Sequence, residues 1–321
     1  MKIGIDTEYA AEVLTHGGLV GIPTETVYGL AGNATDEHVV KKIFKAKNRP
    51  SYDPLIVHLH AVEEVKKYVR DCPDELYDVA HHFWPGPLTI LLPKKSTIPD
   101  CTTSGSELVG LRVPNHALTL DLLRRIPFPL AAPSANPFSY ISPTTAQHVL
   151  DQLSDQVDYI LDGGPCGIGV ESTIVSYLDG KLKIHREGGI SREAFESYGI
   201  KTWNGTAATM ANVPGNFFKH YSPLTPVQII DAVNEIPVNV HESGLIYFGD
   251  SMNVSGFKEV LNISPQGNLN ECARNLFGAM RNMDRMNLNC IYIMKFPDRE
   301  IGRALNDRIE RAAVKRKIKS T

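Results

Sequence analysis

Short apolar runs alternate with stretches of helical periodicity over residues 1–203. Runs of this kind, bounded by Gly, Pro or polar residues, predict strands, and their alternation with helices is typical of a mixed α/β domain. Strands are predicted at residues 19–23, 55–59, 88–93, 108–113, 129–132 and 159–161.

The helix with the clearest signals is predicted over residues 35–47. Thr35 can cap its N-terminus, and the carboxylates of Asp36 and Glu37 suit the first turn because they lie at the positive end of the helix dipole. Apolar side chains recur at helical spacing and predict one buried face, formed by Val39, Val40, Ile43 and Phe44.

Two alternating strands joined by Asp179-Gly180 predict a β-hairpin over residues 172–186. Asp-Gly between such strands is a strong signal for a two-residue turn. This turn fixes the register, and counting back from it places Thr173 opposite Arg186. Ser172 and Arg186 are therefore expected to meet at the open end of the hairpin.

The composition shifts to Gly, Ala, Asn and Pro after residue 203, as it does in linkers. Beyond this stretch the pattern predicts strands at 227–230, 244–248 and 290–294 and helices at 269–286 and 301–314, an order that favours a smaller α/β domain with a parallel sheet. A chain of 321 residues also exceeds what one core usually supports. We therefore expect a domain over residues 1–203, a linker over 204–224 and a second domain over 225–321.

Composition and charge exclude several classes of protein. The 33 Lys and Arg residues are balanced by 36 Asp and Glu residues, so the net charge of -3 gives no field that would gather nucleic acid. The five cysteines are widely spaced without a C-x-x-C pair, which argues against a structural zinc site and a disulfide framework. The N-terminus lacks the apolar core of a signal peptide, and no apolar run is as long as a membrane span. We expect a soluble, cytoplasmic protein that binds no membrane and forms no stable complex with nucleic acid.

Two short motifs place polar side chains two residues apart before a proline: Lys47-Asn48-Arg49-Pro50 and Ser134-Ala135-Asn136-Pro137. Proline disfavours helical backbone in the preceding residue, and side chains at i and i+2 of an extended chain project to the same side. The first motif therefore predicts a pair of exposed cations, and the second predicts a pair of hydrogen-bonding groups. Together they suit a polyanionic ligand such as a nucleotide triphosphate. Thr24 and Thr26 form a third pair with this spacing.

These segments, in this order, resemble the YrdC-like family of L-threonylcarbamoyladenylate synthases. The likeness continues through five further motifs: Pro54-Leu55-Ile56-Val57-His58, Trp84-Pro85-Gly86-Pro87-Leu88-Thr89, Leu111-Arg112-Val113-Pro114, Glu171-Ser172-Thr173-Ile174 and Arg186-Glu187-Gly188. The rest of the chain resembles the long form of the family, which adds a linker and a C-terminal domain. The resemblance implies a YrdC-like twisted mixed sheet with helices and a smaller, Rossmann-like C-terminal α/β domain.

The resemblance also implies an activity. Family members condense L-threonine, bicarbonate and ATP to threonylcarbamoyl-AMP and pyrophosphate, which makes the chain a nucleotidyltransferase. The product serves N6-threonylcarbamoyladenosine formation at position 37 of tRNA, so a tRNA-modifying threonylcarbamoyl transferase is the expected downstream partner. Mg2+ is expected to accompany the ATP, without a metal site made of protein residues.

The family's site residues can be carried over to matching positions of this sequence. The threonine site would comprise Thr26, His58, Arg112, Ala132 and Ser172. The ATP site would comprise Arg49, Asp53, Ser134, Ser142, Arg186 and Tyr221. Catalysis would rest on Lys47, Arg49, Ser134 and Asn136, which hold the reactants and neutralise phosphate charge.

Three of these predicted site residues have features of their own: Asp53, His58 and Tyr221. Position 53 is Asp where the family usually has Asn, and a carboxylate near phosphates repels unless a cation intervenes. His58 is a candidate general base only. Tyr221 lies in the predicted linker, which would fold over the cleft of the first domain as a lid that excludes water.

Two other functions stay open at this point. A pure RNA-binding module would need a basic face, which the charge balance disfavours. A carbamoyltransferase of hydrogenase maturation also contains a YrdC-like domain, but that family adds cysteine-rich zinc motifs that this sequence lacks.

Overall fold

The computed structural model describes residues 2–178, 180–203, 220–232, 235, 240–251 and 254–313. The described residues divide into two compact units. The first lies within Met1–Phe138 and Ser142–Asn216, and the second lies within Ser139–Ile141 and Phe217–Thr321. The predicted linker at 204–219, with its Phe217 and Phe218, lies outside the described residues.

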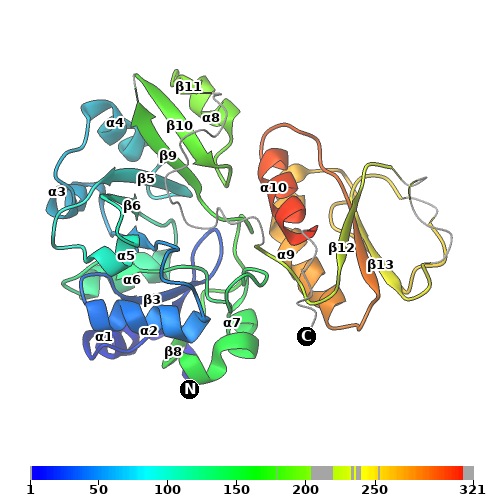
Figure 1. Cartoon of the computed structure of the whole chain (residues 1–321), viewed down its shortest axis with the longest axis horizontal. Helices are drawn as coiled ribbons and strands as arrows, with labels where there is room; N and C mark the ends of the chain where they lie inside the picture. Colours follow the sequence, from blue (N-terminus) through cyan, green and yellow to red (C-terminus); the bar gives the residue numbers. More distant parts are fainter. Residues whose placement is uncertain are drawn as a thin grey trace. The chain divides into compact units, whose positions relative to one another are not determined.

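A mixed sheet of 11 strands forms the centre of the first unit, in the order β1-β8-β2-β3-β7-β4-β6-β5-β9-β10-β11 (Figure 1). The strands are β1 (Lys2–Gly4), β2 (Val20–Ile22), β3 (Gly29–Asn33), β4 (Ile56–His58), β5 (Leu88–Pro93), β6 (Leu108–Arg112), β7 (Leu130–Ala131), β8 (Tyr159–Leu161), β9 (Thr173–Leu178), β10 (Lys181–Arg186) and β11 (Thr202–Trp203). All six strands predicted before the hairpin are confirmed. The prediction missed β3, because two glycines and an Asn in five residues give no strand signal.

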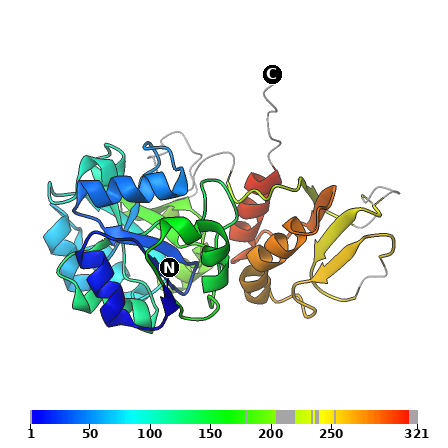
Figure 2. The same cartoon turned by 90° about the horizontal axis from the view of Figure 1, so that it is seen from below.

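Helices cover both faces of this sheet. They are α1 (Thr7–Thr15), α2 (Glu37–Lys47), η1 (Val62–Glu64), α3 (Val65–Tyr68), α4 (Asp74–Phe83), α5 (Asp100–Thr103), α6 (Ala117–Arg125), α7 (Ala146–Leu153), η2 (Ser154–Gln156) and α8 (Arg192–Ser197). One apolar cluster joins α1 and α6 to the sheet, and a larger one joins α2, α4 and α7 to it. Figure 2 shows the sheet between α1 and α2.

The helix α2 begins one residue later than a Thr35 cap would allow. Asp36 is the N-cap, and its carboxylate accepts hydrogen bonds from the amides of His38 and Val39. The Thr35 hydroxyl donates instead to Asn33 Oδ1 at 2.8 Å. The predicted cap is therefore wrong by one position, because a carboxylate that accepts two amide bonds satisfies the helix end better than a hydroxyl. The predicted buried face is confirmed.

The hairpin of β9 and β10 pairs Leu178 with Lys181 as predicted, but its register changes near the open end. Ile184 pairs with Val175, after which a bulge shifts the pairing, so Ile174 rather than Thr173 lies opposite Arg186. The sequence gives no signal for this extra residue, since His185 continues the alternation. The expected meeting of Ser172 and Arg186 still occurs, through direct hydrogen bonds.

The second unit contains a four-stranded sheet in the order β12-β15-β13-β14, and every pairing in it is parallel, as predicted. Its elements are β12 (Val227–Ile230), β13 (Ser243–Tyr247), β14 (Glu259–Asn262), α9 (Leu269–Asp284), β15 (Cys290–Met294) and α10 (Gly302–Ala313). Both helices lie on the same side of the sheet (Figures 1 and 2). Alternate strand residues on the other face form a separate apolar cluster around Leu245, Tyr247 and Tyr292. None of the helices in the described part of the chain combines the length and apolar character needed to span a bilayer.

A three-residue segment from the middle of the chain, Ser139–Ile141, is built into the second unit. Tyr140 donates to the Asp284 carboxylate at 2.6 Å, and its ring lies 5.2 Å from the Arg281 guanidinium. Arg281 is buried and donates to the Ile141 carbonyl. The chain therefore enters the second unit directly after the Ser134–Pro137 motif and leaves it directly before Ser142.

Replacement of Asp284 by Asn should destabilise the second unit. Its carboxylate accepts hydrogen bonds from the Tyr140 hydroxyl and from the amides of Leu224 and Thr225. Because bonds to a charged acceptor contribute more than neutral ones, we expect the free energy of unfolding to fall by about 1–3 kcal/mol. Denaturant unfolding followed through hydrogen exchange of α9 measures the loss, with exposed Asp250→Asn as control. Equal stability of the two variants would contradict this assignment.

Candidate active site

Several of the predicted site residues lie at or near the ends of strands of the first sheet. His58 ends β4 and Arg112 ends β6, and the two residues are register partners in this parallel pair. The loop after β2 supplies Thr26, and Ala132 directly follows β7, which neighbours β4. β7 runs antiparallel to β4, so Ala132 lies beside Ile56 and its amide donates to the Ile56 carbonyl. The topology therefore brings together residues that are distant in sequence.

Arg112 is the centre of a buried hydrogen-bond network. Its side chain is 5% exposed, and its Nη2 donates to the Thr26 hydroxyl at 2.9 Å and lies 2.8 Å from Glu25 Oε1. Thr24 Oγ1 donates to the Val27 carbonyl, so the Thr26 hydroxyl, 2.8 Å away, is the donor to Thr24. The loop thus fixes the guanidinium through a chain of oriented hydroxyl groups.

His58 is buried beside this network. Burial, reinforced by the positive charge of Arg112, lowers the pKa of His58 to about 3. The imidazole is therefore neutral at physiological pH. Its Nδ1 has no hydrogen-bond partner among the described residues. A neutral ring with an unused nitrogen is suited to bind a ligand group.

Lys47 and Arg49 lie close together, but their predicted exposure is wrong. Lys47 is the last residue of α2, and Asn48 has a left-handed backbone with φ of 50°, so the segment is a helix cap instead of an extended chain. Lys47 is 1% exposed and Arg49 is 8% exposed. Pro50 restricts the backbone of Arg49 alone. Lys47 therefore remains in the last turn of α2, which Asn48 caps.

The ammonium group of Lys47 connects α2 to the second motif. Its Nζ donates to the carbonyls of Ser134 and Asn136. Burial and then Arg49 lower the pKa of Lys47, whereas Asp53 opposes this effect. The lysine therefore binds two backbone carbonyls of the second motif, which lie two residues apart, and not the side chains of that motif.

Arg49 is paired with Asp53. Its Nη2 lies 2.8 Å from Asp53 Oδ2, and the guanidinium also donates to the carbonyls of Asp53 and Pro54. Both side chains are nearly inaccessible, with 4% and 0% exposure. The Asp at position 53 is thus compensated by a cation within the protein, which accounts for a carboxylate near a predicted phosphate site.

The second motif is held against the loop after β2. The amide of Leu30 donates to Pro133, and the amide of Ala135 donates to Tyr28. The amide of Asn136 donates to the Ser134 carbonyl, so this segment is a tight turn. Ser134 stays partly exposed, whereas Asn136 is buried and its Nδ2 donates to Pro137.

Ser172 and Arg186 form the next part of the site. Arg186 donates to both the carbonyl and the hydroxyl of Ser172, and the hydroxyl also lies 2.8 Å from Thr89 Oγ1. Gly188 packs so closely on the backbone of Glu171–Thr173 that a Cβ atom would lie 2.4 Å from it. The glycine of the Arg186-Glu187-Gly188 motif is therefore required by this close approach.

The remaining predicted residues divide between the two units. Ser142 donates to Glu171 Oε1 at 2.6 Å, and the amide of Ala132 donates to the Ile56 carbonyl. Tyr221 belongs to the second unit, where its buried ring stacks on Phe277 at 5.6 Å and lies 5.1 Å from the Arg308 guanidinium. Its ATP contact and the lid stay predictions.

Sequence reasoning missed the roles of two carboxylates and one hydroxyl. Glu25 pairs with Arg112, Glu171 accepts from Ser142, and Thr89 contacts Ser172. All three lie inside motifs that had already been singled out. The position of Glu25 between Thr24 and Thr26 was the signal that could have identified it.

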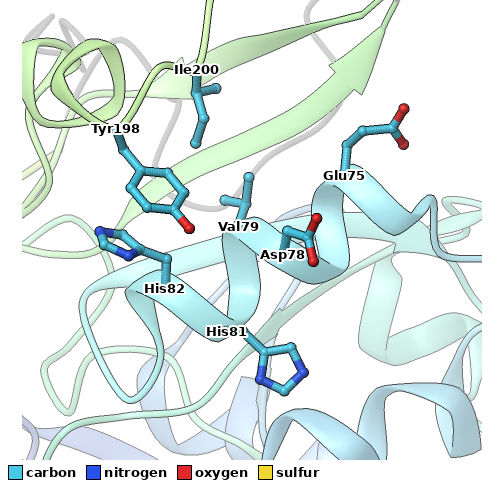
Figure 3. Close-up of a pocket in the computed structure, with 7 residues that line it drawn as sticks. All are labelled: Glu75, Asp78, Val79, His81, His82, Tyr198 and Ile200. Atoms are coloured by element: carbon cyan, nitrogen blue, oxygen red, sulfur yellow. The ribbon is translucent and has the colours of Figure 1, made fainter.

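A surface hollow elsewhere on the first unit contains none of the predicted site residues. It is lined by Glu75, Asp78, Val79, His81 and His82 of α4 together with Tyr198 and Ile200 (Figure 3). The rings of His82 and Tyr198 stack at 3.6 Å. No group of three or more His, Cys, Asp or Glu side chains in the described residues could hold a metal ion, here or at the strand ends.

Replacement of Lys47 by Met should lower stability. Methionine keeps most of the side-chain volume but leaves two buried carbonyls without their donor. We expect a loss of about 2–4 kcal/mol in the free energy of unfolding. The exposed pair of Lys41 and Glu37 offers a control, since Lys41→Met should change stability by less than about 1 kcal/mol. Denaturant titration of both variants measures the loss of stability. An unaltered unfolding midpoint for Lys47→Met would show that the two hydrogen bonds from Lys47 do not stabilise the fold.

The buried imidazole of His58 should make stability depend on pH. Its pKa is lowered from 6.5 to about 3 in the folded protein, so in this window the unfolded chain binds a proton that the folded chain does not. Stability therefore falls as the pH is lowered through the window, by up to about 1.4 kcal/mol per pH unit from this group. His58→Gln should lose stability less steeply than the wild type between about pH 6.5 and pH 4.5. Parallel curves would refute a buried neutral His58, since His116 and His185 are common to both proteins.

The chain is similar to known proteins over nearly its whole length. Residues 12–188 match the model of the Sua5–YciO–YrdC family, described as "Telomere recombination", and residues 190–314 match that of the threonylcarbamoyl-AMP synthase C-terminal domain. The threonylcarbamoyl-AMP synthase of Pyrococcus abyssi is 36% identical over 97% of this chain and 94% of its own length. That of Bacillus subtilis is 35% identical over 97% of this chain and 93% of its own. The crystal structure of P. abyssi Sua5 complexed with L-threonine matches with a TM-score of 0.88 and 33% identity, over 98% of this chain and 97% of the other. The chain belongs to the threonylcarbamoyl-AMP synthase family.

Proposed function

We propose that this chain is an L-threonylcarbamoyladenylate synthase, which condenses L-threonine, bicarbonate and ATP to threonylcarbamoyl-AMP and pyrophosphate. The observation that carries the proposal is the buried network of Arg112 and Thr26, with the buried His58 beside it. The similarity to a Sua5 structure complexed with L-threonine over nearly the whole chain supports it. The match of residues 190–314 to a synthase C-terminal domain favours this activity over that of a hydrogenase-maturation carbamoyltransferase.

Arg112 would bind the carboxylate of the amino acid. Its Nε donates to the Gly86 carbonyl at 3.3 Å and its Nη2 is used by Thr26 and Glu25. Its Nη1 donates to no described residue, which leaves a donor face for a carboxylate. The neutral His58 and the Ser172 hydroxyl would bind the remaining polar groups of threonine.

The nucleotide would bind beside this pocket. Arg49, Ser134, Ser142 and Arg186 would contact ATP, and Lys47 and Asn136 would shape the anion site through the turn that they hold. Because Arg49 and Asp53 form an ion pair, any contact of Asp53 with ATP would include the Arg49 guanidinium. Tyr221 would contact ATP from the second unit, through a lid formed by the linker.

The reaction needs no protein nucleophile. The amino group of threonine first attacks the carbon of bicarbonate, and a C–O bond breaks with loss of water to give a carbamate. The carbamate oxygen then forms a bond to the α-phosphorus while the bond from phosphorus to the pyrophosphate oxygen breaks. The Cys166 thiol is no candidate nucleophile, because burial raises its pKa to about 12. His58, with its pKa lowered to about 3, is a poor base at neutral pH and serves as a hydrogen-bond partner. Positioning of the reactants and stabilisation of phosphate charge would supply the rate enhancement.

Mg2+ would accompany the triphosphate. The described residues offer no cluster of three metal ligands, and Asp53 is engaged by Arg49. This suits a cation that is bound mainly by phosphates and water, as Mg2+ often is. When bound, it would neutralise charge on the leaving pyrophosphate.

The product is a mixed anhydride that water hydrolyses, so it would be consumed by a tRNA-modifying threonylcarbamoyl transferase in the same compartment, which we take to be the cytoplasm. Residues 1–203 would form the catalytic domain, 204–224 the linker and lid, and 225–321 a domain that holds the lid. Stable binding of nucleic acid is not required for this scheme.

Pyrophosphate release from ATP should depend on both L-threonine and bicarbonate. Arg112→Lys removes the planar fork but keeps the charge, so it should raise the KM for threonine by about tenfold or more and leave the KM for ATP nearly unchanged. The exposed Arg125, which pairs with Asp121, offers the control substitution Arg125→Lys. Threonine-independent pyrophosphate release, or an unchanged threonine KM in Arg112→Lys, would refute the proposed site.

A further inference from the structure

Glu25 is a buried carboxylate with unused acceptor capacity inside the proposed amino-acid pocket. Its side chain is 11% exposed and its Oε1 lies 2.8 Å from Arg112 Nη2. This contact lacks hydrogen-bond geometry, and neither carboxylate oxygen accepts a hydrogen bond from any residue that the structure describes. A buried carboxylate left in this state costs free energy, so a donor from outside the described residues is expected to complete it.

The charged and titratable neighbours of Glu25 come from three different elements. Arg112 ends β6, His116 precedes α6, and Cys166 lies in the loop after β8. Burial and then the negative charge of Glu25 raise the pKa of Cys166, and the same charge opposes the fall in the pKa of His116 that burial causes. Arg112 is the cation among these neighbours, 2.8 Å from the carboxylate.

Arg112 and Glu25 together match the two charges of a free amino acid. Arg112 keeps the two N–H groups of Nη1 without a partner among the described residues, and Glu25 keeps acceptor positions on both oxygens. An α-amino acid carries a carboxylate and an ammonium group on one carbon. A donor fork beside an incompletely bonded carboxylate is the complementary arrangement.

We infer that Glu25 is a positioning and specificity residue, which accepts a hydrogen bond from the α-ammonium group of the amino acid whose carboxylate Arg112 binds. The inference rests on the proposed function, because that function puts the amino acid at Arg112. The nitrogen keeps one N–H after carboxylation, so the same contact holds the carbamate in place. Glu25 would also discriminate against molecules that carry a carboxylate and a hydroxyl but no amino group. With such a ligand, the Glu25 carboxylate would lie beside the ligand carboxylate and would receive no hydrogen bond from it.

Ligand analogues test whether Glu25 binds the ammonium group, only orients Arg112, or only competes with the substrate carboxylate for Arg112. The probes are L-threonine and 3-hydroxybutyrate, which keeps the carboxylate and the hydroxyl but lacks the amino group. Affinities are measured by ligand-observed NMR, which reads weak binding. Glu25→Gln should weaken L-threonine by about ten- to hundredfold, since a hydrogen bond between charged groups is lost. The affinity for 3-hydroxybutyrate should stay unchanged or rise.

Two outcomes overturn the inference. Equal weakening of both ligands would mean that Glu25 only orients Arg112. Strengthening of both would mean that Glu25 only competes with the substrate carboxylate. Glu64→Gln is the matched control, because Glu64 is also a mostly buried carboxylate, 16% exposed, whose partners His60 and Lys67 lie outside the site.

A shorter acid keeps the experiment decisive if Glu25→Gln does not fold. Glu25→Asp retains the charge but withdraws the carboxylate by one methylene, and it should also weaken L-threonine without weakening 3-hydroxybutyrate. Thermal unfolding establishes that each variant is folded before binding is measured. A wild-type protein that fails to bind L-threonine refutes the proposed function itself, whereas normal threonine affinity in both folded Glu25 variants refutes only the role of Glu25.

Discussion

The burial of four cations in the first unit is the constraint on which the site depends. Lys47, Arg49, Arg112 and Arg186 are each less than one-tenth exposed. A desolvated cation is costly unless nearby groups compensate it, and here the compensation comes from strand ends and loops that only the folded chain assembles. Backbone carbonyls accept from Lys47 and Arg186, while carboxylates lie beside Arg49 and Arg112. The same contacts that stabilise the fold therefore hold positive charge where an anionic ligand is expected.

This arrangement explains why the predicted conformation and exposure of the Lys47 motif were wrong. The ammonium partners of Lys47 are 87 and 89 residues away in sequence, and no local pattern reports such contacts. The periodicity of apolar residues, by contrast, predicts strands and helices well, because it records which side faces the core. Three local features were not predicted: the Asp36 cap, the bulge before Arg186 and the strand Gly29–Asn33. In each of them two or more local conformations suit the sequence, so the pattern of apolar residues does not decide between them.

The resemblance predicts which residues form the site, and the structure shows what surrounds each of them. His58 is neutral because burial and Arg112 lower its pKa, so it is a hydrogen-bonding group and a poor base. Asp53 departs from the family's usual Asn, yet the Arg49 guanidinium compensates it. Glu25 lies between two threonines that drew attention first, and its incomplete hydrogen bonding became visible only in three dimensions. The passage of Ser139–Ile141 into the second unit was likewise unforeseen, because a three-residue segment carries no domain signal of its own.

The central claim is that L-threonine and ATP bind at the strand ends of the first unit. Hydrogen exchange of the full chain, with and without both ligands, tests this most directly. The account predicts slower exchange in residues 23–30, 56–59, 110–114 and 130–136, which contain the loop after β2 and the ends of β4, β6 and β7. Protection confined to residues 74–83 and 198–200, around the hollow of Figure 3, would contradict it.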